Sequence, residues 1–451
     1  MGAFHAYDIR GVYNVDFDKD VAYKVGYFLP ELLSADKVLV GRDARVSSDE
    51  IHEWLLKGIT DAGADVYDAG LCTTPMVYFG TAFYGFKASV QITASHNPAE
   101  YNGMKVSREN ALPVGYDTGL GQIKEWIEAG RECPVAEKRG EVHQIDVRKD
   151  YLPFLLKYKE DWSGLKIAMD VSNGMASLFV HEIFGDEPAY IYDNMDGTFP
   201  NHEPNPLVPK NVVDLQKLVA ATKADIGIIF DGDADRVMFV DENSRFISPD
   251  LMIAVLGHYF LEERGEKGYI HQDIRSSKAV GEYLAPMGGV MNTWRVGRAY
   301  AALKLRELDG VYGGELAGHY YFRDFFYSDS GLLAAVLIVN VVAKMKAQGV
   351  SLSQLIGRIE KYQNSGEINF RLEDKKGAMD AVRDYFMQKE KSTAYMDFDG
   401  YRVEFPDWWF NIRPSNTEPY LRFICEATTK ELLDEKVAKV REILTDQFGA
   451  K

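Results

Sequence analysis

Residues 226–240 read IGIIFDGDADRVMFV, and this stretch decides the fold. Two apolar runs, Ile226–Phe230 and Val237–Val240, flank a polar loop that contains three aspartates. Runs of this length that are rich in β-branched residues and bounded by Asp and Gly predict two strands joined by a tight turn. The aspartates therefore follow a strand directly, which is where α/β proteins place their ligand sites.

The same pattern recurs along the chain: a short apolar run, a polar cluster and then a helical stretch. The other apolar runs are Val38–Val40, Ala88–Thr93 and Ile167–Val171. Strands that alternate with helices indicate α/β layers. After the first of these runs, Ser47 and Glu50 have the spacing of a capping box, which predicts the start of a helix there.

The end of the chain has a different pattern, typical of a small α+β domain. Antiparallel strands are predicted at Phe370–Leu372, Tyr401–Phe405 and Trp408–Ile412, followed by a helix that begins at a Thr428–Glu431 capping box. We therefore expect three α/β domains with mixed sheets plus a small C-terminal α+β domain, around a central cleft. The expected boundaries are 1–145, 146–245, 246–360 and 361–451.

Composition limits the class of protein. The 451 residues carry a formal net charge of −17, which is the opposite of the balance usual in nucleic-acid-binding proteins. Three widely spaced cysteines and a first segment without an apolar run favour a reducing, cytoplasmic location. The longest apolar stretch, Leu332–Met345, is shorter than a membrane span, so we expect a buried helix and no membrane association.

The acidic loop is the strongest sign of chemistry. Asp231, Asp233 and Asp235 can converge on a hard cation, and Mg²⁺ is the expected ion. Three other interpretations remain open: a solvated acidic turn, a phosphatase with Asp231 as nucleophile, and a calcium EF-hand loop. Glu242 occupies the twelfth EF-hand position, but Arg236 stands where that loop has glycine.

A second polar loop, Thr93–Pro98, contains Ser95 and His96 after a predicted strand. A serine at such a junction is exposed and can be a nucleophile, although it is often only a turn residue. We expect the neighbouring His96 side chain to diverge from it, and the Gly-x-Ser-x-Gly elbow of hydrolases is absent. Together with the acidic loop, a phosphorylated Ser95 would supply an anionic oxygen to a metal site.

Two further loops offer groups that bind phosphates and sugars. Residues 413–419 read RPSNTEP, with Arg422 just beyond, and provide guanidinium, hydroxyl and amide donors for a phosphate dianion. Residues 313–319 read GGELAGH, in which Glu315 and His319 can bond sugar hydroxyls. Taken alone, these loops are also compatible with ordinary turns, and Arg10 and Arg275 are more typical of ordinary salt-bridge arginines.

In this order, the four loops resemble those of the α-D-phosphohexomutase superfamily, and most closely its bacterial phosphomannomutase/phosphoglucomutase branch. The resemblance implies that Ser95 is the phosphoserine and that Ser95, Asp231, Asp233 and Asp235 bind the metal. The residues implied around the transferring phosphoryl are Arg10, His96, Lys105 and Arg236. The implied substrate-binding residues are Glu315, His319, Arg413, Ser415, Asn416, Thr417 and Arg422, and Arg275 is a further candidate.

The resemblance implies an isomerase that interconverts hexose 1-phosphate and hexose 6-phosphate, of mannose and/or glucose. It would act through phosphoserine, Mg²⁺ and a hexose 1,6-bisphosphate intermediate, with small sugar phosphates as its partners. A phosphoglucosamine mutase, a metal-dependent sugar-phosphate phosphatase and a non-catalytic sugar-phosphate binder are the alternatives. Two residues depart from the family pattern: Ala317 replaces a serine in the sugar loop, and Arg298 replaces a histidine.

Overall fold

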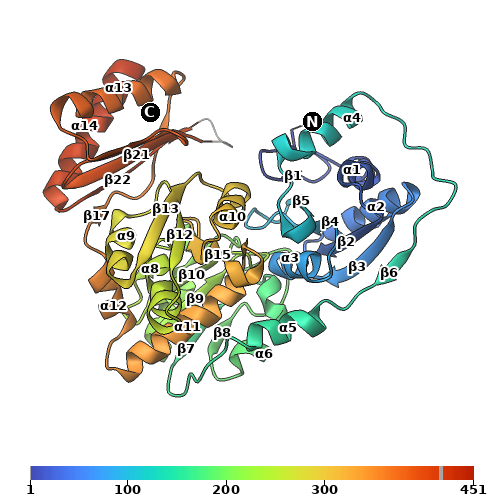
Figure 1. The fold of residues 1–451 in the computed structure, drawn as a ribbon, viewed down its shortest axis with the longest axis horizontal. Helices are drawn as coiled ribbons and strands as arrows, with labels where there is room; N and C mark the ends of the chain where they lie inside the picture. Colours follow the sequence, from blue (N-terminus) through green and yellow to red (C-terminus); the bar gives the residue numbers. More distant parts are fainter. Residues whose placement is uncertain (1, 416–419) are drawn as a thin grey trace.

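The computed structural model describes residues 2–415 and 420–451, and its four sheets follow one another along the chain. Three of these sheets mix parallel and antiparallel pairs, whereas the fourth is antiparallel throughout. This confirms the predicted fold class. In Figure 1 the first sheet (blue) lies at the right and the fourth (red) at the upper left, with the second and third sheets between and below them.

The first sheet has the strand order β1-β5-β4-β2-β3-β6. Its strands are β1 (Ile9–Val12), β2 (Lys37–Arg42), β3 (Asp65–Leu71), β4 (Ala88–Ile92), β5 (Tyr101–Arg108) and β6 (Val142–Gln144). Its helices are α1 (Lys19–Leu33), α2 (Ser48–Asp61), α3 (Thr74–Phe83) and α4 (Leu120–Glu128). Because β5 returns antiparallel to β4, Lys105 pairs with Gln91 and lies beside the loop that carries Ser95.

The predicted capping box before α2 is absent. Ser47 is helical in backbone conformation and its side chain makes no cap bond. Its hydroxyl instead accepts a 2.8 Å hydrogen bond from the Asn102 amide, and the Glu50 carboxylate accepts one of 3.0 Å from the Tyr13 hydroxyl. Tertiary partners therefore take both polar groups away from the helix end.

The second sheet has the order β11-β10-β9-β7-β8. Its strands are β7 (Ile167–Asp170), β8 (Ala189–Ile191), β9 (Ile226–Phe230), β10 (Val237–Asp241) and β11 (Phe246–Ile247), and its helices are α5 (Arg148–Leu156), α6 (Val180–Phe184) and α7 (Val213–Thr222). As predicted, β9 and β10 are fully buried strands joined by the acidic loop, and they pair antiparallel. The three aspartates therefore lie in the turn of a buried hairpin.

The third sheet has the order β13-β12-β14-β15-β16. Its strands are β12 (Gly268–Asp273), β13 (Gly289–Trp294), β14 (Tyr312–Gly314), β15 (Tyr320–Phe322) and β16 (Ser328–Asp329). Its helices are α8 (Leu251–Gly257), α9 (Lys278–Leu284), α10 (Arg298–Glu307), α11 (Gly331–Ala347) and α12 (Leu352–Ile359).

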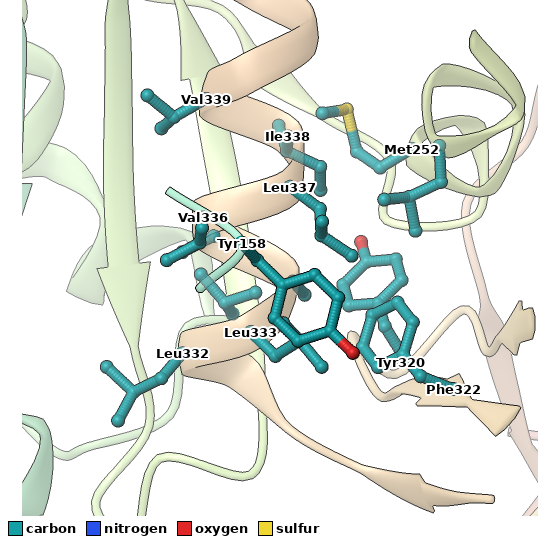
Figure 2. Close-up of a cluster of buried hydrophobic side chains, with 14 of the residues drawn as sticks. Tyr158, Met252, Tyr320, Phe322, Leu332, Leu333, Val336, Leu337, Ile338 and Val339 are labelled. Carbon is teal, nitrogen blue, oxygen red and sulfur yellow. The ribbon is translucent and has the colours of Figure 1, made fainter. Parts of the chain in front are cut away.

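Helix α11 contains the apolar stretch that was predicted to be buried, and it is buried. Its side chains pack against Tyr158, Met252, Tyr320 and Phe322 (Figure 2). This core is continuous with buried side chains of the first two sheets. Among the described residues, no single helix is long and apolar enough to cross a membrane, and α11 with α12 passes that test only as a pair bent by 102°.

The fourth sheet has its own core, and two helices pack on it (Figure 1). Its strands are β17 (Gln363–Asn364), β18 (Ile368–Arg371), β19 (Ala394–Met396), β20 (Tyr401–Glu404), β21 (Trp408–Pro414) and β22 (Tyr420–Ala427), and its helices are α13 (Lys375–Lys389) and α14 (Lys430–Phe448). The N-cap of α14 is Thr429, whose side chain accepts a hydrogen bond from the backbone N–H of Leu432. The predicted cap at Thr428 was wrong by one residue.

Candidate active site

A cleft of about 770 Å³ opens where the four sheets meet, and every sheet contributes to its lining. The predicted site residues that line it are Arg10, His96, Lys105, Asp235, Arg236, Arg275, Glu315, His319, Arg413, Ser415 and Arg422. Ser95, Asp231 and Asp233 are buried at its edge. Asn416 and Thr417 fall outside the described residues.

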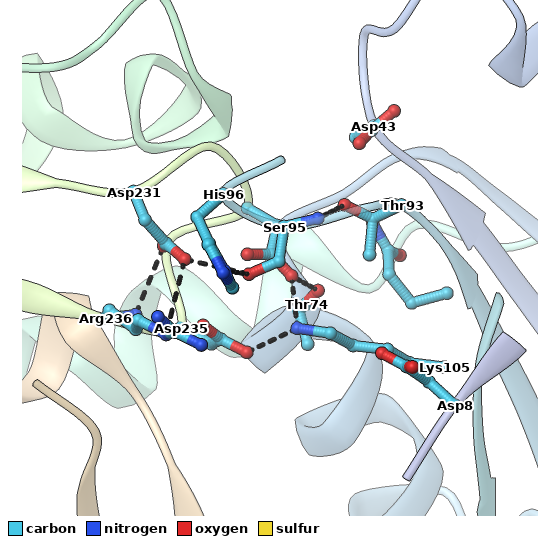
Figure 3. Close-up of polar contacts among 12 residues, drawn as sticks. Asp8, Asp43, Thr74, Thr93, Ser95, His96, Lys105, Asp231, Asp235 and Arg236 are labelled. Atoms are coloured by element: carbon cyan, nitrogen blue, oxygen red, sulfur yellow. Dashed lines mark hydrogen bonds and ion pairs between the residues drawn. The ribbon is translucent and has the colours of Figure 1, made fainter. Parts of the chain in front are cut away.

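Ser95 lies in the loop after β4 with a left-handed backbone, φ 53°. Its N–H donates to the Thr93 hydroxyl at 2.9 Å, and its own hydroxyl donates to Asp231 Oδ2 at 2.9 Å (Figure 3). The acidic loop approaches very closely here, because a Cβ on Gly232 would lie 2.5 Å from the Ser95 carbonyl oxygen. The glycine between the first two aspartates is therefore required for the contact between the two loops.

The Asp231, Asp233 and Asp235 side chains are fully buried, and oxygen atoms from the three lie within 4.8 Å of one another. Burial, together with the other two carboxylates, raises the pKa of Asp231 well above its ordinary value. Oδ1 of Asp233 and Oδ1 of Asp235 have no hydrogen-bond partner among the described residues. Concentrated negative charge and orphaned oxygens of this kind fit a hard divalent cation.

Lys105 supplies part of the counter-charge. Its Nζ lies 2.6 Å from Asp233 Oδ2 and 2.5 Å from Asp235 Oδ2 (Figure 3). Burial by itself lowers the pKa of this lysine, but the two carboxylates outweigh that effect and raise it. The ammonium is therefore charged and held across the acidic loop.

The EF-hand interpretation is wrong. Strands rather than helices flank the acidic loop. Glu242, which occupies the twelfth position of that pattern, points instead to α12, where it accepts hydrogen bonds from the backbone N–H and the hydroxyl of Ser353 at 3.0 and 2.5 Å. Glu242 therefore does not take the place of a cation ligand in this loop.

His96 is closer to Ser95 than its position next to it in sequence predicted. Its Nδ1 lies 3.4 Å from the Ser95 hydroxyl, so the expected divergence of the two side chains was wrong. The left-handed turn at Ser95 brings them together. Burial and then the charges of Arg236 and Arg10 lower the pKa of His96 well below its ordinary value, so the imidazole is neutral near pH 7.

The residues of the sugar loop lie across the cleft from the acidic loop. Glu315 Oε1 accepts a 2.7 Å hydrogen bond from the Gly297 N–H, and burial raises the pKa of this carboxyl. His319 Nε2 accepts from Arg236 Nε at 3.0 Å, and its Nδ1–H donates to Asp329 at 2.7 Å. The second and third sheets are thereby joined directly across the cleft.

At the other end of the cleft, arginines of two sheets converge. Arg275 follows β12 and forms a two-point ion pair with Asp273, at 3.1 and 2.8 Å. Arg413 is on β21, is only 5% exposed, and has a buried Nε without a hydrogen-bond partner among the described residues. Burial and the neighbouring Arg275 lower the pKa of Arg413. This concentration of guanidiniums suits a dianion.

Comparison with known proteins matches this architecture to one family. Models of the phosphoglucomutase/phosphomannomutase family match in order: alpha/beta/alpha domain I over residues 1–132, domain II over 149–244, domain III over 248–362 and the C-terminal domain over 367–443. The chain belongs to the phosphoglucomutase/phosphomannomutase family. It is therefore an enzyme, an isomerase that acts on hexose phosphates.

Individual relatives agree with this assignment. A phosphomannomutase of Salmonella montevideo is 37% identical over an alignment 454 residues long, which covers 96% of this chain and 98% of that protein. The crystal structure of a family protein from Burkholderia thailandensis has a TM-score of 0.86 at 29% identity and covers 98% of this chain and 97% of that one. An N-acetylphosphoglucosamine mutase of Aspergillus fumigatus, in complex with GlcNAc-6P and magnesium, shares the fold at TM-score 0.58 and 14% identity, covering 82% and 91% of the two chains.

The mutase holds its serine loop with a residue that sequence reasoning missed. Arg45 has a fully buried side chain that donates to the carbonyl oxygens of Ser95, Asn97, Pro98 and Tyr101, at 3.0, 2.7, 2.6 and 3.0 Å. Its position in a polar cluster directly after a predicted strand was the available signal. Thr74 was missed as well; it hydrogen-bonds Asp233 through both its hydroxyl and its backbone N–H.

Arg298, which stands where the family pattern has histidine, makes contacts in this mutase that link two sheets. Arg298 Nε donates to Asp329 at 2.8 Å, its Nη2 donates to the Ala111 carbonyl at 3.1 Å, and its guanidinium lies 3.6 Å from the centre of the Tyr78 ring. Asp329 is the carboxylate that also receives the His319 hydrogen bond. The arginine therefore connects the third sheet to the first.

Proposed function

We propose that this mutase moves a phosphoryl group between O1 and O6 of mannose and/or glucose phosphates through phospho-Ser95 and a hexose 1,6-bisphosphate. The 2.9 Å contact between the Ser95 hydroxyl and Asp231 is the observation that carries the proposal. A phosphate on that oxygen would sit beside the buried acidic loop, where a bound cation would offset the added negative charge. We further propose that the protein acts in the cytoplasm. The three free cysteines support this location.

Mg²⁺ would be held by Asp231, Asp233, Asp235 and an oxygen of phospho-Ser95. When bound, it would neutralise charge on the transferring phosphoryl group. The two orphaned aspartate oxygens and the magnesium in the Aspergillus fumigatus relative support this choice of ion.

The chain's own cations would act on the same group. We assign Lys105, Arg236 and Arg10 to stabilising the charge that spreads over the phosphoryl oxygens during transfer. Arg10 is oriented for this by Asp8 and by Asn97, whose Oδ1 accepts from Nη1 at 2.9 Å. Neutral His96 would donate a hydrogen bond in the same region rather than add another charge.

In the first transfer, the bond from phosphorus to Ser95 Oγ breaks and a bond to the free sugar hydroxyl oxygen forms. The sugar hydroxyl loses its proton, and Ser95 Oγ gains one, so the serine hydroxyl is restored. The bisphosphate then turns over, and the reverse transfer from its other end returns a phosphoryl group to Ser95. Glu315 and His319 would bind the ring hydroxyls in both orientations. The phosphate that does not react would be bound by Arg275, Arg413, Ser415, Asn416, Thr417 and Arg422, here called the phosphate clamp.

We propose that the four loops belong to domains bounded at 1–145, 146–245, 246–360 and 361–451, so that closing the cleft brings them together. Ala317 lines the cleft where the family pattern has serine, which removes one hydroxyl contact to the sugar. The choice between mannose and glucose would then depend more heavily on Glu315 and His319.

The test compares Ser95→Ala with Ser89→Ala. Ser89 is equally buried, lies on the strand before the serine loop and bonds Thr81 away from the cleft. Purified parent protein should carry phosphate on Ser95, seen by peptide mass spectrometry, and should interconvert mannose or glucose 1- and 6-phosphates. Ser95→Ala should abolish turnover and Ser89→Ala should retain it.

Wild-type mutase activity in Ser95→Ala would refute the covalent mechanism. If Ser95→Ala released inorganic phosphate while Asp231→Asn did not, the phosphatase interpretation would replace it. A preference for glucosamine 1-phosphate would instead favour the amino-sugar enzyme.

A further inference from the structure

A carboxylate lies among the arginines of the phosphate clamp. Glu367 is in the short segment between β17 and β18, which leads into the fourth sheet. Its Oε1 accepts a 3.0 Å hydrogen bond from Arg422 Nη1, and its Oε2 lies 3.8 Å from Arg275 Nη1. One side chain thereby contacts arginines that belong to two different sheets.

The positively charged clamp arginines repel one another, so a neighbouring negative charge stabilises them. Arg275 already has Asp273 as a partner, whereas Arg413, among the described residues, has only a distant ion pair with Asp399, at 3.9 Å. The Glu367 side chain is 26% exposed, so it can leave the arginines without breaking a packed core. Its segment also follows the boundary between the large shared core and the separate core of the fourth sheet.

Guanidinium groups bind carboxylates and phosphates with the same donors. A carboxylate offers two oxygens and one charge, whereas a phosphate monoester offers three terminal oxygens and nearly two charges. Both arginines that Glu367 contacts line the cleft. A phosphate that bound the same nitrogen atoms would therefore have to displace the Glu367 carboxylate.

We propose that Glu367 is an internal anion that competes with the non-reacting phosphate of the substrate for Arg275 and Arg422. The inference rests on the proposed function of the clamp. Phosphate binding releases the carboxylate, and departure of the phosphate lets it return. The bisphosphate must leave the clamp in order to turn over. A carboxylate that competes for the same arginines makes that release faster.

Glu367→Gln tests this, because it keeps the side chain's size and removes its charge. We expect inorganic phosphate to bind about 3- to 10-fold more tightly by titration calorimetry, and KM for hexose 1-phosphate to fall by a similar factor. kcat should also fall, because the bisphosphate is held longer. Glu367→Asp, which keeps the charge on a shorter side chain, should gain less affinity.

The matched control is Glu282→Gln. Glu282 bonds the Tyr362 hydroxyl at 2.7 Å near the same connection but contacts none of the clamp arginines. It should leave phosphate affinity and KM unchanged. In an Arg422→Ala background, the gain from Glu367→Gln should shrink, since the carboxylate then has one arginine fewer to compete for.

Unchanged or weaker phosphate binding in Glu367→Gln would overturn the proposal, since weaker binding means that Glu367 orients the arginines instead. An equal gain in Glu282→Gln would overturn it too, because the effect would then reflect net charge alone. The calorimetry requires no turnover. Tighter phosphate binding in a protein without mutase activity would therefore refute the proposed function and leave the competition standing.

Discussion

The hydroxyl of Ser95 donates a 2.9 Å hydrogen bond to Oδ2 of Asp231, a residue 136 positions further along the chain and on a different sheet. The contact joins the loop after β4 to the turn between β9 and β10. It depends on Gly232, where a side chain would collide with the serine carbonyl. Three buried carboxylates that repel one another therefore lie next to the oxygen that we propose to be phosphorylated.

This arrangement makes the site dependent on its metal. Removing metal with a chelator should abolish turnover while leaving the fold largely intact, because the acidic loop lies on a hairpin that is already buried. Mg²⁺ should raise the Tm of the parent protein, since an ion that binds only the folded state stabilises it. Ca²⁺ should bind but support little activity, because its looser coordination positions the phosphoryl poorly.

Asp231→Asn should lose the Mg²⁺-dependent rise in Tm and nearly all activity. Asp241→Asn is the control; Asp241 is a buried aspartate at the end of the same hairpin that accepts from the backbone N–H groups of Asn243 and Arg245. Turnover with Ca²⁺ equal to that with Mg²⁺, or an unchanged metal response in Asp231→Asn, would contradict the role given to the loop.

Arg413→Ala should reduce kcat/KM by about one to two decades, since a charge-assisted hydrogen bond contributes roughly 1.5–3 kcal/mol. Part of the loss should appear in kcat, because binding of the remote phosphate also positions the reacting hydroxyl. Phosphorylation of Ser95 should persist, and activity should depend more strongly on added hexose 1,6-bisphosphate. Steady-state kinetics would measure these effects, with Arg383→Ala, on the surface of α13, as the control. Unchanged efficiency and bisphosphate dependence would remove Arg413 from the clamp.

Arg45→Lys should lower kcat by about 10-fold or more and change KM little. A lysine keeps the charge beside Asp43 but lacks the planar fork that bonds several carbonyl oxygens of the serine loop. Arg42→Lys is the control, because Arg42 pairs with exposed Asp49 outside the loop. If Arg45→Lys raised KM and left kcat unchanged, the arginine would act on substrate binding and not on the position of Ser95.

Stability should fall as the pH falls, in part through His271. This fully buried histidine on β12 has a pKa lowered by burial from 6.5 to about 4. The unfolded chain therefore takes up a proton first, so the contribution of His271 to stability is complete above pH 6.5 and is lost as the pH falls toward 4. Between pH 7.5 and 5.5 the expected loss is about 1 kcal/mol.

His271→Phe, which cannot titrate, should show a correspondingly smaller loss in its free energy of unfolding over this range. Urea unfolding of both proteins at the two pH values would measure the difference. Equal losses in the parent and the variant would mean that His271 takes up its proton without unfolding.

Much of this site was predictable because its chemistry is local in sequence. The alternation of apolar runs and polar clusters predicted the fold class and placed the serine loop and the acidic loop at the ends of strands. The Asp231–Asp235 spacing predicted a cation site, since three carboxylates at alternate positions of one turn can converge on a hard cation. The chemistry of a phosphorylated serine suggested a link between that loop and Ser95, and the family resemblance implied the same link.

Tertiary structure alone decided the contacts that cross from one sheet to another. Thr74 acts on Asp233, 159 positions further along the chain, and no local pattern marks it as part of the site. Arg45 stands in a polar cluster after a predicted strand, but only the folded chain brings its guanidinium to the carbonyl oxygen of Ser95. Glu367 is an ordinary glutamate in sequence and becomes a clamp residue only where two sheets meet. The capping pattern at Ser47 failed for the same physical reason. A side chain's partners depend on what folding brings near it, and distant groups outcompete the local bond that sequence spacing predicts.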